Sequence, residues 1–204
     1  MKESEFYGWA LPQLINSNIT VKFLNKPKHL NCGGWFAEDK KELVVCTKHE
    51  DAFSIFIHEF CHFLQFRDDP QAWSLCTGTD TFFAWLQGKD FSKEEVAEAT
   101  HQAQALEHDC ETKALKLIKQ LNIDIDVGKY TQKANAYLFS YLITKKLRLW
   151  PNTKNSIYES EISEYFDPKL VSLEQLKYLK NIPRPAVTAW KAKCYNLDSV
   201  LKKV

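Results

Sequence analysis

Two histidines and a glutamate within five residues are the side chains best placed to do chemistry. The run His58-Glu59-Phe60-Cys61-His62 matches H-E-x-x-H. Residues four apart lie on one face of a helix, so both histidines can direct an imidazole nitrogen at one ion. Glu59 lies about 100° round the helix from His58, where a carboxylate can act as general base toward metal-activated water. We therefore predict a Zn²⁺ site with His58 and His62 as ligands and Glu59 as a catalytic residue.

The surroundings of this run indicate a buried helix. No Gly or Pro interrupts residues 50–69, and aromatic and aliphatic residues leave no wholly polar face. A helix that is apolar on nearly all sides is buried. Two core histidines satisfied by hydrogen bonds are the alternative interpretation. We favour a metal, because polar groups buried without partners are costly and a metal supplies the partner.

A second helix, predicted from residue 93 to about 121, carries the candidate third ligand. At 100° per residue its apolar residues fall in one stripe. Glu107 lies about 50° from the centre of that stripe, Glu111 about 90° and His108 about 150°. We expect His108 and Asp109 to face solvent, and Glu107 to point most nearly at the core.

A catalytic zinc site usually has three protein ligands and one open position. We predict Glu107 as the third metal ligand. Glu111, one turn on, can hydrogen-bond a ligating histidine and so orient its ring. The alternative for Glu107 and Glu111 is a solvated helix face with ion pairs to Lys113 or Lys116.

The two motifs together carry a family resemblance. His58-Glu59-x-x-His62 followed by Glu107-x-x-x-Glu111 resembles the gluzincin metallopeptidases. The run EHDCETKALKLI is similar to the second motif of compact cytoplasmic members and of uncharacterised peptidases encoded by phages and other viruses. The resemblance covers about residues 19–150 and implies a zincin-like domain, although Glu111 stands where many members have Asp.

The expected fold is α+β, mainly helical, with a small antiparallel sheet before the H-E-x-x-H helix. We expect one metallopeptidase domain over residues 1–204, with a catalytic core at about 19–150 and a tail, 151–204, packed on it. The expected strands are Ile19–Leu24, Leu30–Ala37 and Glu42–Thr47. The expected helices are 3–16, about 50–67, 93–121 and 130–149, with one short helix in a packed loop at 70–91. In the tail we expect a helix at Leu173–Leu179 and a break at the Pro-Arg-Pro of 183–185.

Substrate contacts are less specific in the sequence. The oxyanion formed during hydrolysis needs a donor, and Tyr137 and Tyr141 on the 130–149 helix are candidates. Their alternative role is an aromatic core stripe. The strand Glu42–Thr47 could bind an extended peptide by strand addition, or serve the sheet alone.

Composition bounds the partners and the compartment. The chain has a net charge of +1, so we expect no nucleic-acid or membrane partner. The N-terminal residues lack the apolar run typical of a signal peptide, and no stretch reaches the length of a membrane helix, so we expect neither segment. The six cysteines include no C-x-x-C pair, and we expect free thiols in a reducing cytoplasm, that of a host cell if the protein is virus-encoded.

We therefore predict a zinc-dependent peptidase whose partner is a protein or peptide substrate. One alternative is a non-catalytic interaction protein with a vestigial metal site. Another is a metal-dependent amide hydrolase acting on a non-protein substrate. The intact Glu59 argues against the first, because a structural zinc site has no use for that carboxylate. The oligomeric state is left open.

Overall fold

A computed structural model of the chain describes residues 1–25, 33–150, 157 and 160–201, with side chains described as far as residue 192. The fold is mainly helical with one small three-stranded sheet, so the predicted α+β class is confirmed. The chain divides into two compact units, and each is described by itself. The first unit contains residues 1–74 and 109–126, and the second contains 75–108 and 127–204. The prediction of a single domain stays a prediction.

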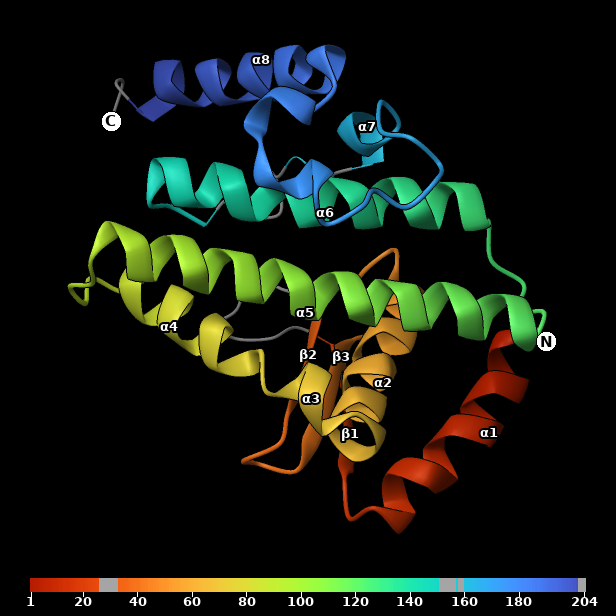
Figure 1. The fold of residues 1–204 in the computed structure, drawn as a ribbon. Coiled ribbons are helices and arrows are strands. Elements are labelled where there is room, and N and C mark those ends of the chain that lie inside the picture. The colour runs from red at the N-terminus through yellow and green to blue at the C-terminus, as the bar shows by residue number, and fades with distance from the viewer. Residues whose placement is uncertain (26–32, 151–156, 158–159, 202–204) are drawn as a thin grey trace. The chain divides into compact units, whose positions relative to one another are not determined.

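The first unit holds the sheet and the H-E-x-x-H helix (Figure 1). Its elements are α1 (Glu3–Asn16), β1 (Thr20–Leu24), β2 (Gly34–Ala37), β3 (Glu42–Cys46), α2 (Ala52–Asp68), α3 (Pro70–Trp73) and the C-terminal part of α5 (Lys93–Gln120). Pro12 does not break α1, which is one continuous helix. Of the predicted hairpin strand Leu30–Ala37, residues 30–32 lie outside the described part of the chain.

The sheet is mixed, which corrects the predicted antiparallel sheet. The strand order is β1-β3-β2, with β2 antiparallel and β1 parallel to β3. A hairpin turn can join only antiparallel neighbours, so the β2–β3 pairing followed from the short link between them. β3 is the central strand and is paired along both edges. The predicted addition of a peptide to Glu42–Thr47 is therefore wrong.

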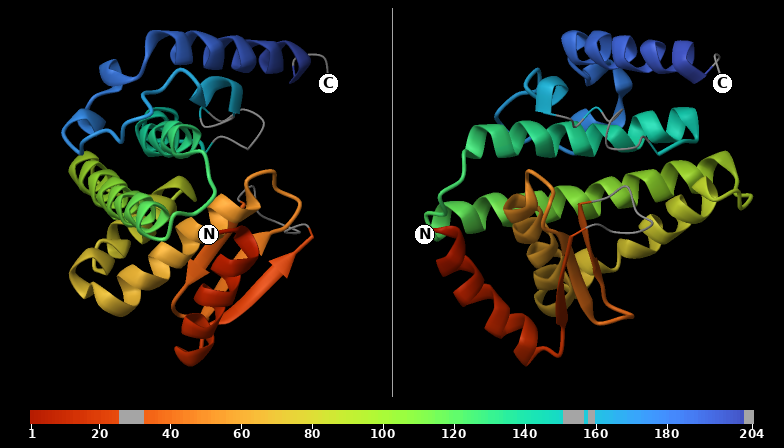
Figure 2. Two further views of the ribbon diagram at one scale, coloured as in Figure 1. Left: turned by 90° about the vertical axis from the view of Figure 1, so that its right-hand side faces the viewer. Right: turned by 180° about the vertical axis from the view of Figure 1, so that it is seen from behind.

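One face of the sheet packs on α1 and α2, which lie on the same side of it (Figures 1 and 2). Side chains two apart on a strand share a face. Phe23 of β1 meets Tyr7 of α1 and Phe56 of α2, with ring centroids 5.7 and 6.1 Å away. Phe36 of β2 meets Phe63 of α2 at 6.2 Å. These aromatic contacts fix α2, and with it the histidines, against the strands.

The end of α2 has a local cause. Asp69 precedes Pro70, and a residue before proline is disfavoured in the helical region; its φ and ψ are −138° and 70°. Asp69 then accepts a hydrogen bond from the Ala72 amide at 3.1 Å and caps α3. The predicted loop at 70–91 instead contains two helices, α3 and α4 (Cys76–Leu86).

The second unit is helical. It contains α4, the N-terminal part of α5, α6 (Val127–Leu147), α7 (Ser160–Ser163), the 3₁₀ turns η2 (Gln175–Lys177) and η3 (Leu179–Asn181), and α8 (Arg184–Leu201). Buried Leu138, Phe139 and Ile143 of α6 pack with Phe166 and Leu176 of the tail. The tail thus completes the core of this unit.

In the second unit, α5 begins where predicted, whereas two stretches of the tail differ from the prediction. Ser92 and Glu95 form a capping box at the start of α5, with reciprocal hydrogen bonds of 2.7 and 3.1 Å. The predicted helix at Leu173–Leu179 is wrong, because that stretch forms 3₁₀ turns. The predicted break at 183–185 is the beginning of α8, since proline is tolerated in the first turn of a helix.

Candidate metal centre

Helix α2 brings the two histidines of the motif together. His58 and His62 lie one turn apart, with ring centroids 4.7 Å apart and their Nε2 atoms 3.1 Å apart. Two nitrogens bound tetrahedrally to one zinc would lie about 3.3 Å apart, from a Zn–N length of about 2.05 Å. The two Nε2 atoms therefore stand at a separation that suits shared ligation of one ion.

The other ring nitrogens each meet a polar partner. His58 Nδ1 lies 3.0 Å from Glu111 Oε1 on α5. His62 Nδ1 lies 2.7 Å from Oε1 of Gln65, and Gln65 Nε2 donates to Asp109 Oδ2 at 2.7 Å. Glu111 thus makes the contact expected of a residue that orients a ligating histidine, and Gln65 makes the equivalent contact to the second histidine.

These partners favour one arrangement of the imidazole protons. An ionised carboxylate only accepts hydrogen bonds, so Glu111 favours a proton on His58 Nδ1. The Gln65 amide nitrogen is committed to Asp109, so the Gln65 oxygen accepts from His62 Nδ1–H. In neutral rings both Nε2 atoms would then face one another with lone pairs across 3.1 Å, a separation that a proton or a metal ion can bridge. The donor set therefore fits a metal ion bound through Nε2.

Glu59 packs beside β2 of the sheet. Its side chain is 7% exposed. A Cβ placed on Gly34 of β2 would come within 3.3 Å of Glu59 Cγ, so the carboxylate stem packs directly against that strand. Among the described residues, β2 pairs with β3 alone and is an edge strand. Glu59 therefore lies beside a strand edge and next to a histidine of the motif.

Two cysteines adjoin the histidines. Cys110 Sγ lies 3.7 Å from His58 Nδ1 and donates to the His58 carbonyl oxygen at 3.3 Å. His58, His62 and Cys110 each bring a ligand atom within 4.8 Å of the others. Burial, followed by the nearby Cys110, raises the pKa of the Cys61 thiol well above its usual value. Cys61 is therefore a neutral, buried thiol inside the motif.

Glu107 and the two tyrosines form a cluster within the second unit. The hydroxyls of Tyr137 and Tyr141 donate to Glu107 Oε1 at 3.3 and 3.1 Å and lie 3.2 Å apart. Glu107 is buried, as predicted. It precedes Glu111 by one turn of α5 but belongs to the other unit. Its role as third ligand and the role of Tyr137 toward an oxyanion stay predictions.

Asp109 and His108 lie differently from the prediction. Asp109 and His108 were expected to face solvent. Asp109 instead accepts from Gln65 and Lys113, and His108 Nε2 bonds the Val171 carbonyl oxygen at 2.7 Å. Glu111 pairs with His58, and Lys113 pairs with Asp109 and with Asp69 of α3. The available signal was Gln65, a polar side chain within an apolar helix that had to find a partner.

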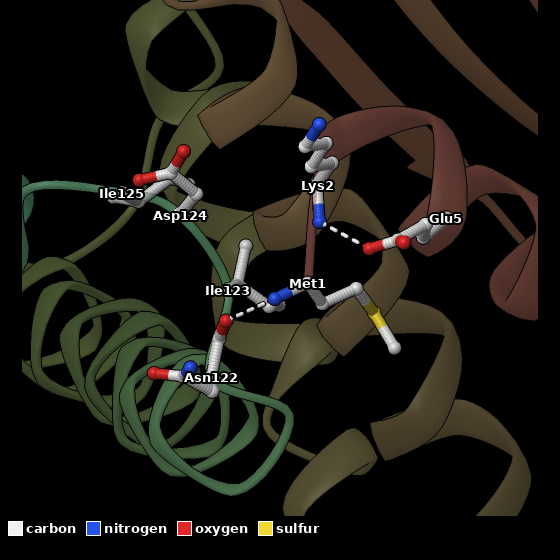
Figure 3. A pocket seen from close by; sticks show the side chains of 7 residues that line it. All are labelled: Met1, Lys2, Glu5, Asn122, Ile123, Asp124 and Ile125. Atoms are coloured by element: carbon white, nitrogen blue, oxygen red, sulfur yellow. Dashed lines mark hydrogen bonds between the residues drawn. The ribbon is translucent and has the colours of Figure 1, made fainter.

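A pocket in the first unit contains none of these residues. It lies where the N-terminus meets the end of α5, and the Met1 amino group donates there to the Asn122 carbonyl oxygen (Figure 3). Asn122 has a φ of 47°, and the Ile123 amide bonds back to Ile118 at 2.9 Å. These contacts satisfy carbonyls at the end of the helix, which is a structural role.

Comparisons with known proteins do not add to the site. Scans against protein-family models, curated proteins and solved structures find no match for this chain. No helix in the described part of the chain combines the length and apolarity that crossing a bilayer requires.

Proposed function

We propose that this protein is a zinc-dependent peptidase with a zincin-like catalytic site. His58 and His62 hold the ion through their Nε2 atoms, Glu107 is the third ligand, and Glu59 is the general base. The observation that carries the proposal is the pair of Nε2 atoms 3.1 Å apart, each on a ring whose Nδ1 faces a side-chain oxygen.

The chain's own residues then divide the reaction among them. A bound zinc ion acts as a Lewis acid toward a carbonyl and lowers the pKa of water. Glu59 accepts a proton from the attacking water as the C–O bond forms. It then passes this proton to the amine nitrogen of the leaving group as the C–N bond breaks. Glu111 and Gln65 keep both imidazole rings oriented during this exchange. Burial of Glu59 keeps bulk water away from its carboxylate.

The substrate class follows from the edge strand. β2 adjoins Glu59 through Gly34, and an extended peptide can add to such an edge through backbone hydrogen bonds. Backbone pairing aligns a peptide bond without demanding one sequence. We therefore propose protein or peptide substrates, bound along β2 in place of the predicted binding along β3.

The test is Glu59→Gln, assayed on a peptide library with and without chelator. The amide is nearly isosteric and leaves both histidines intact, so zinc content should match wild type. Activity should fall by about 10²–10⁴-fold, the usual contribution of general acid–base catalysis. Glu94→Gln removes an exposed carboxylate of α5 and should leave both values unchanged. Wild-type cleavage rates in Glu59→Gln would refute the proposed mechanism.

A second candidate function rests on Cys110. Two histidines and a cysteine within 4.8 Å also suit a structural metal site, because such sites are closed by Cys and His. That interpretation describes an interaction protein without catalysis. Cys110→Ser and Glu107→Ala separate the two. The peptidase proposal requires zinc to stay in the first variant and to be lost from the second, whereas the structural site requires the reverse.

A further inference from the structure

A carboxamide with no solvent exposure lies behind His62. Gln65 is one turn further along α2 and is 0% exposed. Its oxygen faces His62 Nδ1 at 2.7 Å and its nitrogen donates to Asp109 Oδ2 at 2.7 Å. A carboxamide keeps almost the same shape when it turns by half a rotation, but its donor and acceptor exchange places. Shape alone therefore allows Gln65 to meet His62 with either end.

The two orientations have opposite consequences for His62. With the oxygen toward Nδ1, the imidazole carries its proton on Nδ1 and leaves the Nε2 lone pair open. With the amide N–H toward His62, the imidazole Nδ1 becomes the acceptor and the imidazole proton moves to Nε2. A proton on Nε2 occupies the position that a metal ion would need. His62 can therefore bind a metal ion through Nε2 in the first orientation of Gln65 and not in the second.

Asp109 determines the orientation of the Gln65 carboxamide, because its carboxylate can only accept hydrogen bonds. The same oxygen that accepts from Gln65 also accepts from the Lys113 ammonium group, and Lys113 donates in turn to Asp69 Oδ2 at 3.0 Å. Asp69 is itself held by the Ala72 amide at the start of α3. The acceptor that faces Gln65 is therefore fixed by a chain of ionic contacts within the first unit.

We infer that Asp109 is a positioning residue that locks the Gln65 carboxamide and so holds His62 in the tautomer that can bind metal. The metal part of this inference rests on the proposed function. The tautomer part concerns the protein without metal and can be tested alone. Loss of an outer partner of a ligating histidine typically weakens metal binding about 10–100-fold.

The experiment compares Asp109→Leu with Asp109→Asn. Leucine removes the acceptor at similar size. Asparagine loses the charge but keeps an oxygen that can accept from both Gln65 and Lys113, so it is the matched control. Long-range ¹H–¹⁵N spectra of histidine-labelled, metal-free protein, recorded about two units above the usual histidine pKa of about 6.5, report the tautomer of each ring.

In wild type and Asp109→Asn, both motif histidines should carry the proton on Nδ1. In Asp109→Leu, His62 should shift toward the Nε2-protonated tautomer, while His58, held by Glu111, stays unchanged as an internal control. Zinc competition should show Asp109→Leu binding about 10–100-fold more weakly than wild type, with Asp109→Asn close to wild type.

Gln65→Met gives an independent variant in case Asp109→Leu does not fold, because it removes the amide at similar volume. His62 should then populate both tautomers, and adding Asp109→Leu should change its spectrum no further. An unchanged His62 tautomer in Asp109→Leu or in Gln65→Met would overturn the inference. Absence of zinc binding in wild type would instead refute the proposed function, since the tautomer is measured without metal.

Discussion

Gly34→Ala should destabilise the first unit, because the strand beside Glu59 has no room for a side chain. An added Cβ would lie 2.7 Å from the backbone oxygen of Val44 and 2.7 Å from Ile55 Cγ2. The Val44 oxygen belongs to the central strand, so it cannot move without disturbing the sheet. The clash must be relieved by moving β2 away from α2, and this carries the edge strand away from Glu59.

The expected size follows from these contacts. Overpacking costs about 1–3 kcal/mol, and a rigid backbone neighbour places this site near the upper end. Alanine offsets about 0.4–1 kcal/mol by restricting the unfolded chain, which leaves a net loss of about 2 kcal/mol. At about 2–4 °C per kcal/mol for a chain of this size, the unfolding midpoint should fall by about 4–8 °C.

Gly8→Ala is the matched control in the same unit. Gly8 is exposed within α1, and a Cβ there would meet nothing within 4 Å. Alanine should therefore raise stability by about 0.5–1 kcal/mol through helix propensity. Calorimetry of both variants in chelator, without zinc, checks the pair. A Gly34→Ala midpoint equal to or above that of wild type would show that β2 does not lie tightly on α2.

Three further predictions concern the ion, the sheet and the thiols. Metal analysis should find zinc lost from both His62→Ala and Glu107→Ala; full zinc content in Glu107→Ala would move the third ligand elsewhere. The Lys22 ammonium group holds the pKa of Glu42 below its usual value, so the stability that this pair confers is present above pH of about 4 and is lost as pH falls through the lowered pKa. Glu42→Gln should therefore be less stable than wild type in urea at pH 7, and the difference should shrink toward acid; a difference that grew toward acid would contradict this. Thiol titration of denatured protein without reductant should find all six cysteines free, whereas a reproducible count of two or none would contradict the cytoplasmic prediction. Cys46, Cys61, Cys76 and Cys110 are free in the structure, and the side chains of Cys32 and Cys194 lie outside its described part.

The sequence by itself determined the elements whose geometry is local. The helix carrying His58 and His62, the long helix carrying Glu111 and the capping box at Ser92 all follow from spacings of three or four residues. Helical hydrogen bonds join residues four apart, so a short stretch contains nearly all the information that its helix needs. The β2–β3 hairpin was predictable for the same reason, because a short turn joins its strands.

Tertiary structure alone decided which distant residues meet. The parallel pairing of β1 with β3 and the central place of β3 depend on how the chain returns past the sheet, which no local pattern records. Asp109 lies 44 residues beyond Gln65, and its angle on α5 indicated solvent when the helix was taken alone. The partner of a buried polar group is whatever donor or acceptor the packed chain brings to it. For that reason the two histidines proposed as ligands were evident from their spacing, whereas the partners of their Nδ1 atoms emerged only with the fold.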